Sequence, residues 1–96
     1  MNKLTLLVVF ACTFFSLKAQ DKMYKSINNL YIATKFEDAK TEIDKLMSDP
    51  KATDKAETWL WRTRIYSELY YSEELRKKYA GCGNIALEAF MKYENL

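Results

Sequence analysis

The sequence predicts an all-α fold built from antiparallel helix pairs, with about four helices after an N-terminal export signal. Its 96 residues include only two Gly and one Pro, which are residues that tight turns and hairpins need. Beyond residue 21, apolar side chains recur at helical spacing with few interruptions. These observations disfavour a multi-stranded β fold, and the length supports one small domain.

The first 19 residues have the features of a secretory signal peptide. Lys3 supplies the positive charge, and Leu4–Leu17 is an uncharged, largely apolar run. As a helix this run is about 21 Å long, whereas the apolar core of a bilayer is about 30 Å thick. We therefore expect cleavage after Ala19 and export, with no membrane span in the mature chain. The alternatives are an uncleaved anchor, a buried helix, or a lipoprotein signal modified at Cys12.

The expected mature chain, residues 20–96, carries balanced charge. Lys3 and Lys18 belong to the signal, so the 15 Lys and Arg residues fall to 13, against 13 acidic residues. The longest basic run, Arg76–Lys78, directly follows Glu73–Glu74, which places opposite charges four residues apart on a solvated helix face. Proteins that bind nucleic acid usually carry a basic face instead, so no nucleic-acid partner is expected.

Few groups in the mature chain could carry out chemistry. The absence of His removes imidazole catalysis and His-ligated metals. The single Cys, Cys82, is expected to be a small loop residue, with an intermolecular disulfide as the alternative. Two carboxylate pairs fall in charged, solvated stretches, unlike catalytic carboxylates: Asp38/Glu42 and Glu73/Glu74. We predict no enzyme activity, no cofactor and no metal.

Two helices joined by a tight turn are predicted first. One spans about residues 22–33 with Asp21 as its N-cap, and the other spans about 36–47. Ser48–Pro50 should end the second helix, because proline disfavours helical backbone in the residue before it. Since only the polar Thr34–Lys35 break separates them, the two helices are expected to form an antiparallel αα-hairpin.

The third helix is the strongest element and is expected to end near Tyr71. Thr53 or Asp54 can cap its start, and Glu57 would complete a capping box with Asp54. Apolar residues cover well over half of its circumference, with Arg62 as the one charge on that side. Such a helix should contact neighbours on two sides or carry a partner on one of them.

The C-terminal part is predicted as a loop and a final helix. Residues 72–79 either continue the third helix or restart with Ser72 as the cap. Gly81–Gly83 should be a loop, and Asn84 should cap the last helix. The inner face of that helix is expected to hold five residues: Ile85, Ala86, Ala89, Phe90 and Tyr93.

Two spacings match the packing pattern of a known helical repeat. Trp59, Thr63 and Tyr66 have the spacing W-x3-small-x2-Y, and Ala86 and Phe90 have the spacing A-x3-F. The chain thereby resembles tetratricopeptide-repeat (TPR) proteins, especially exported bacterial ones, which place packing residues at these spacings on the two helices of each unit.

The resemblance extends over about residues 22–96 as two units. Apolar residues fall at the matching positions of the earlier unit: Met23, Ile27 and Leu30 on its first helix, Ala39 and Ile43 on its second. The first-helix shift is 36 residues and the second-helix shift is 47, so the second unit has about 11 extra residues between its helices. A plain four-helix bundle whose aromatic residues share these spacings is the alternative.

The resemblance implies a non-catalytic protein–protein interaction scaffold with a protein or peptide partner. With the signal, it implies a periplasmic or secreted protein of the Gram-negative cell envelope. The alternative function is a small secreted four-helix bundle with a structural, self-associating role. In both cases the last helix leaves apolar surface uncovered, so self-association through it is expected.

Eight residues are the candidates for packing and interaction: Trp59, Trp61, Thr63, Tyr66, Tyr70, Ala86, Phe90 and Tyr93. Most of the aromatic residues among them are expected in the core. Trp61 lies at the edge of the apolar arc of the third helix, and it is the best candidate for stacking against a ligand.

Overall fold

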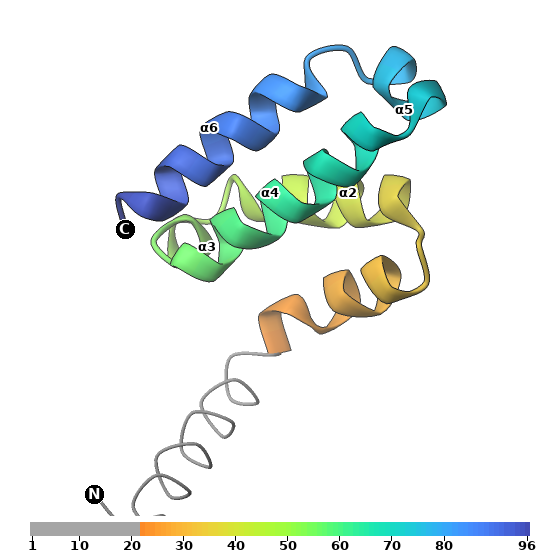
Figure 1. The fold of residues 1–96 in the computed structure, drawn as a ribbon. Coiled ribbons are helices and arrows are strands. Elements are labelled where there is room, and N and C mark those ends of the chain that lie inside the picture. The colour runs from red at the N-terminus through yellow and green to blue at the C-terminus, as the bar shows by residue number, and fades with distance from the viewer. Residues whose placement is uncertain (1–21) are drawn as a thin grey trace, which may run out of the picture.

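The computed structural model describes residues 22–96, which form helices joined by short connections (Figure 1). After a helix over 22–32 come α2 (Phe36–Leu46), α3 (Pro50–Thr53), α4 (Ala56–Tyr71), α5 (Glu73–Lys78) and α6 (Cys82–Glu94). No strand occurs among these residues, so the predicted all-α fold is confirmed. The predicted signal peptide at 1–19 and its alternatives, including modification of Cys12, lie outside the described residues.

Helix 22–32 and α2 form the predicted hairpin through a turn at residues 33–35. The Lys35 N–H donates to the Leu30 carbonyl at 2.9 Å, and the Thr34 N–H donates to the Tyr31 carbonyl at 3.0 Å. These two bonds are those of a Schellman C-cap, which needs a left-handed residue at Thr34. Thr34 accordingly has a φ of 59°, although it carries a β-branched side chain.

The start of the third long helix differs from the prediction. Asp49 caps the short helix α3 by accepting a hydrogen bond from the Lys51 N–H at 3.0 Å, and Pro50 takes the first helical position. Asp54 ends α3 with helical backbone angles, φ −80° and ψ −9°, so it cannot adopt the extended conformation that an N-cap needs. Helix α4 instead begins after Lys55, which makes no side-chain capping bond.

Helix α4 is the centre of the fold, with the hairpin on one side and α6 on the other (Figure 1). Ile65 and Leu69 of α4 are completely buried, and they share one apolar core with Ile27 of helix 22–32 and Ile43 of α2. Two hydrogen bonds tie helix 22–32 to α4: the Tyr24 hydroxyl with Thr58 Oγ1 at 2.7 Å, and the Tyr31 hydroxyl to Glu68 Oε1 at 3.2 Å. The predicted two-sided contact of this helix is confirmed.

The chain between α4 and α6 restarts as a separate helix. Ser72 has extended backbone, and its Oγ accepts a hydrogen bond from the Leu75 N–H at 3.3 Å, so of the two alternatives the structure shows the restart with Ser72 as the cap. Lys78 Nζ lies 2.8 Å from Glu37 Oε2, and the Tyr79 hydroxyl donates to the same oxygen. These contacts fasten the end of α5 to the start of α2.

Helix α6 begins three residues earlier than predicted, so the expected Asn84 cap is wrong, and Cys82 and Gly83 belong to the helix rather than to a loop. Gly81 has a φ of 87° and turns the chain directly into the helix. Cys82 then packs in the core with 1% of its surface exposed, which corrects its expected place in a loop. A Cβ on Gly83 would lie 2.8 Å from Tyr70 Cδ2, so glycine permits the close approach of α6 to α4.

Candidate functional site

The eight candidate residues separate into three groups by burial. Trp61, Tyr66 and Ala86 are buried, Trp59, Thr63 and Tyr93 are half-buried, and Tyr70 and Phe90 are exposed. The buried residues therefore pack in the core and the exposed ones face solvent, although their spacing in the sequence suggested one common packing pattern.

Tyr66 joins α4 to α2 through a polar cluster around Asp44. Its hydroxyl donates to Asp44 Oδ1 at 2.8 Å, and Arg62 Nη1 binds the same oxygen at 3.0 Å. Lys40 Nζ binds the other carboxylate oxygen at 3.0 Å. Burial of the ring, together with the bond to Asp44, raises the pKa of Tyr66 well above its usual value. The arrangement stabilises the helix packing and leaves the Tyr66 hydroxyl engaged inside it.

The prediction that Trp61 is available to a ligand is wrong. Only 7% of Trp61 is exposed, and its ring meets Tyr31 edge-on with the centroids 5.6 Å apart. The guanidinium of Arg64 lies 5.1 Å from the ring centroid of Trp61. Helix 22–32 covers the edge of the apolar arc that the sequence left open, so Trp61 belongs to the core.

Trp59 and Thr63 fix the start of α4. Trp59 Nε1 donates to the Thr53 carbonyl at 2.9 Å, which holds α3 against α4. Thr63 Oγ1 donates to the Trp59 carbonyl at 2.8 Å, one turn back along the helix. Lys92 of α6 places its Nζ 5.9 Å from the ring centroid of Trp59. Trp59 thus contributes to the contact of α4 with its neighbours.

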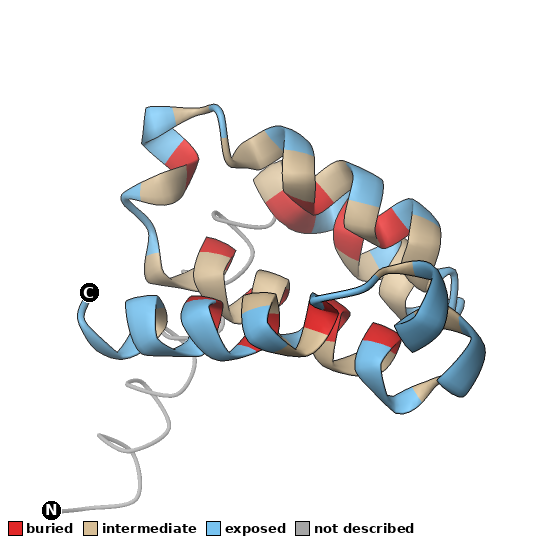
Figure 2. Cartoon of the chain, turned by 90° about the horizontal axis from the view of Figure 1, so that it is seen from above, coloured by how far each residue is buried: buried red, intermediate tan, exposed pale blue. Residues whose placement is uncertain are grey.

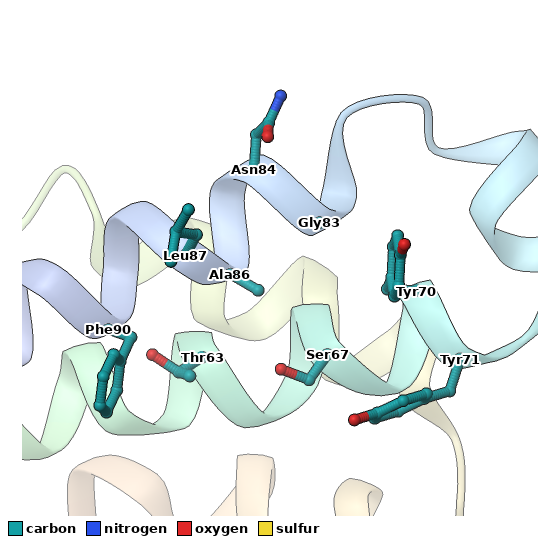
Figure 3. Close-up of a pocket in the computed structure, with 9 residues that line it drawn as sticks. All are labelled: Thr63, Ser67, Tyr70, Tyr71, Gly83, Asn84, Ala86, Leu87 and Phe90. Carbon is teal, nitrogen blue, oxygen red and sulfur yellow. The ribbon is translucent and has the colours of Figure 1, made fainter.

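A groove of about 450 Å³ runs between α4 and α6 (Figure 3). We call it the α4/α6 groove, and its lining residues are Thr63, Ser67, Tyr70, Tyr71, Gly83, Asn84, Ala86, Leu87 and Phe90. Tyr70 and Tyr71 stand at the end nearest α5, and Phe90 stands at the opposite end. Leu87 and smaller residues lie between them. The groove therefore offers apolar walls and a few hydroxyl and amide groups.

Exposed apolar side chains gather along this groove and on the outer side of α6. Tyr71 is 78% exposed, Leu87 58%, Met91 56% and Phe90 44%. Figure 2 shows the side of α6 that faces away from its neighbours as largely exposed. We call Leu87, Phe90 and Met91 the α6 stripe. Contiguous exposed apolar surface of this kind usually marks a contact with another molecule.

Sequence reasoning identified Phe90 and Tyr70 but missed Tyr71, Leu87 and Met91. It also assigned Phe90 to the inner face of the last helix, which the structure corrects. Helix α6 meets α4 through its small residues Ala86 and Ala89, so the larger Phe90 is left at the edge of the contact. The spacing of Leu87 and Met91, one turn apart and displaced from the two alanines, was the signal that could have revealed the stripe.

The described residues offer neither a metal site nor a membrane-spanning helix. Residues 22–96 hold no group of three or more Cys, Asp and Glu side chains placed to bind a metal ion. None of the helices in the same part of the chain combines the length and apolar character that crossing a membrane requires.

No protein-family model, no curated protein and no solved structure matches this chain. Its function therefore has to be inferred from its own residues. The α4/α6 groove and the α6 stripe are the features that indicate a function, because no other residue of 22–96 covers their large apolar side chains.

Proposed function

We propose that this chain is a non-catalytic protein–protein interaction scaffold of TPR type, exported to the bacterial cell envelope. The main support for this proposal is that four exposed apolar residues lie beside one groove: Tyr71, Leu87, Phe90 and Met91. Aromatic residues and Met are enriched at protein interfaces, and the groove has the walls that receive another protein's apolar side chains.

The packing inside the chain supports a helix as the ligand of such a groove. Helix α4 lies against the pair formed by helix 22–32 and α2, and it buries Ile65 and Leu69 there. The next pair, α4 and α6, presents an open surface in the corresponding place. Stacked helix pairs bury one face against the next unit, so a pair whose outer face no other helix covers leaves that face available to a partner helix.

The proposed export rests on the sequence of the first 19 residues. Their positive start and short apolar run are those of a signal peptide, with cleavage proposed after Ala19. A periplasmic or secreted location follows from this proposal. The small secreted bundle that associates with itself remains the second candidate, and the same exposed α6 stripe favours it.

A site-specific photo-crosslinker tests the scaffold proposal in cells. The crosslinking amino acid replaces Tyr71 or Leu87 in the full-length chain, and in a matched control it replaces Lys25, an exposed residue of helix 22–32. We expect a discrete crosslinked protein from the two groove positions and none from position 25, with its identity read by mass spectrometry. Equal labelling at all three positions, or none at the groove, would contradict the proposal.

A further inference from the structure

We propose that a second copy of this chain covers the α6 stripe, with the two α6 helices packed antiparallel about a twofold axis near Phe90. This inference rests on the proposed interaction function and names the partner of the same surface. Three features carry it: the distribution of exposed apolar residues, the order of residues along α6, and the charges that border the stripe.

Most of the large exposed apolar residues in the described chain lie on α6 and at the end of α4. Ile32 is the only large exposed apolar residue among them that lies outside α6, the end of α4 and the C-terminal Leu96. The exposed side of helix 22–32 carries Lys25, Ser26 and Asn29, with Ile32 as its one large apolar side chain. Among the described elements, α6 therefore offers a second copy the most exposed apolar residues. Contact between the same α6 surface of two copies is isologous and closed.

The order of residues along α6 suits an antiparallel twofold contact. Leu87 and Met91 are one turn apart and form the centre of the exposed side. An axis at Phe90 places the Phe90 rings of the two copies opposite one another on the groove side. Phe90 already stacks on Tyr93, with ring centroids 6.3 Å apart. The second α6 would lie along the Phe90 end of the α4/α6 groove.

The charges beside the stripe are complementary to their own twofold image. Glu88 and Lys92 each follow a stripe residue by one position, so both border the stripe on the same side. In an antiparallel pair related by a twofold axis, equal sides of the two helices face each other. An axis at Phe90 therefore brings Glu88 opposite Lys92 of the second copy, and this happens twice. Opposite charges at such positions select partner and register.

Sedimentation velocity at tens of micromolar tests the contact and its register together. The chain is purified after expression of the full-length gene in a Gram-negative host. We expect the wild type to sediment as a dimer. Glu88→Lys places like charges together at two symmetric sites and should weaken self-association about tenfold. The double variant Glu88→Lys/Lys92→Glu restores the pairing and should recover the wild-type association.

A matched control lies on α5, where Lys77 Nζ and Glu73 Oε1 are 3.3 Å apart at an exposed site. Glu73→Lys and Glu73→Lys/Lys77→Glu change the same charges at the same spacing and should leave association unchanged. Circular dichroism confirms that every variant remains helical, and the charge swap distinguishes lost contact from lost fold.

Three results overturn the inference: a monomeric wild type, a dimer insensitive to Glu88→Lys, or a double variant that stays as weak as the single one. A monomer that still crosslinks from Tyr71 to a different protein would refute the second copy while leaving the scaffold function standing. A dimer without any other crosslinked protein supports the inference and favours the self-associating bundle.

Discussion

The Tyr66 hydroxyl donates a hydrogen bond of 2.8 Å to Asp44, and this bond joins two helices whose residues are 22 positions apart in sequence. Asp44 also receives Arg62 of α4 and Lys40 of its own helix, so one carboxylate holds three donors. Tyr66, the last residue of the W-x3-small-x2-Y spacing, therefore joins the two helices by a hydrogen bond as well as by apolar packing.

Removal of this carboxylate is expected to destabilise the fold more than removal of one donor. Asp44→Ala leaves Tyr66 and Arg62 without their acceptor and should cost about 1.5–3 kcal/mol. Tyr66→Phe keeps the ring in the core and should cost about 1 kcal/mol. Urea unfolding of both variants measures the difference. If Tyr66→Phe lowered the free energy of unfolding more than Asp44→Ala does, Asp44 would not be the group that holds the three donors together.

The two tryptophans are expected to differ in their contribution to stability. Trp61 is buried against Tyr31, so Trp61→Ala should cost about 3–5 kcal/mol, the usual penalty for a large aromatic residue removed from a core. Trp59 is half-buried with one hydrogen bond, so Trp59→Ala should cost about 1–3 kcal/mol. Urea midpoints give the order. An unchanged midpoint in Trp61→Ala would contradict the core described here.

Thr34 adopts left-handed backbone, which is less favourable for threonine than for glycine. Left-handed backbone costs an L-residue roughly 1–2 kcal/mol, and glycine avoids most of that cost. Thr34→Gly should therefore raise the free energy of unfolding by about 0.5–1 kcal/mol. Lys35→Gly is the control, because Lys35 has a φ of −88° and gains nothing from glycine. An equal change in the free energy of unfolding at both positions would show that the left-handed backbone of Thr34 is not the cause.

Acid should loosen the attachment of α5 to α2. The hydrogen bonds from Lys78 and Tyr79 hold the pKa of Glu37 below its ordinary value of 4.5. A lowered folded-state pKa gives stability that is present above 4.5 and lost as the pH falls through the folded value. Glu37→Gln should thus be less stable than wild type at neutral pH, with the difference shrinking in acid. A difference that grows in acid would reverse this assignment.

The long helices followed from apolar spacing, whereas their exact starts depended on local backbone conformation. Periodicity located the hairpin and α4 because each buries a continuous face. The start of α4 was missed because Pro50 and Asp49 first form α3, which uses the residues that would otherwise cap α4. The start of α6 was missed because Gly81 and Gly83 signal a loop in sequence, yet Gly83 serves a close helix contact with Tyr70.

The exposed apolar surface of α6 was only partly predictable for a different reason. A helical wheel shows which residues share a side, but it does not show which side the neighbouring helix covers. Trp61 was placed at an open edge because the path of helix 22–32 was unknown. Leu87 and Met91 were passed over because the buried side of α6 is formed by small alanines, which give a weak apolar signal.

We expect the outer side of α6 to be covered by another protein molecule in the native compartment. Peroxide oxidation of methionines in intact cells, read by mass spectrometry, tests it directly, since oxidation of Met follows exposure of its sulfur. In the isolated chain Met91 is exposed and Met47 is half-buried. Without a partner, Met91 would therefore oxidise before Met47. If another protein covers the α6 stripe, Met91 oxidises more slowly than Met47 in cells. Faster oxidation of Met91 in cells would show that the α6 stripe is uncovered and would contradict the claim.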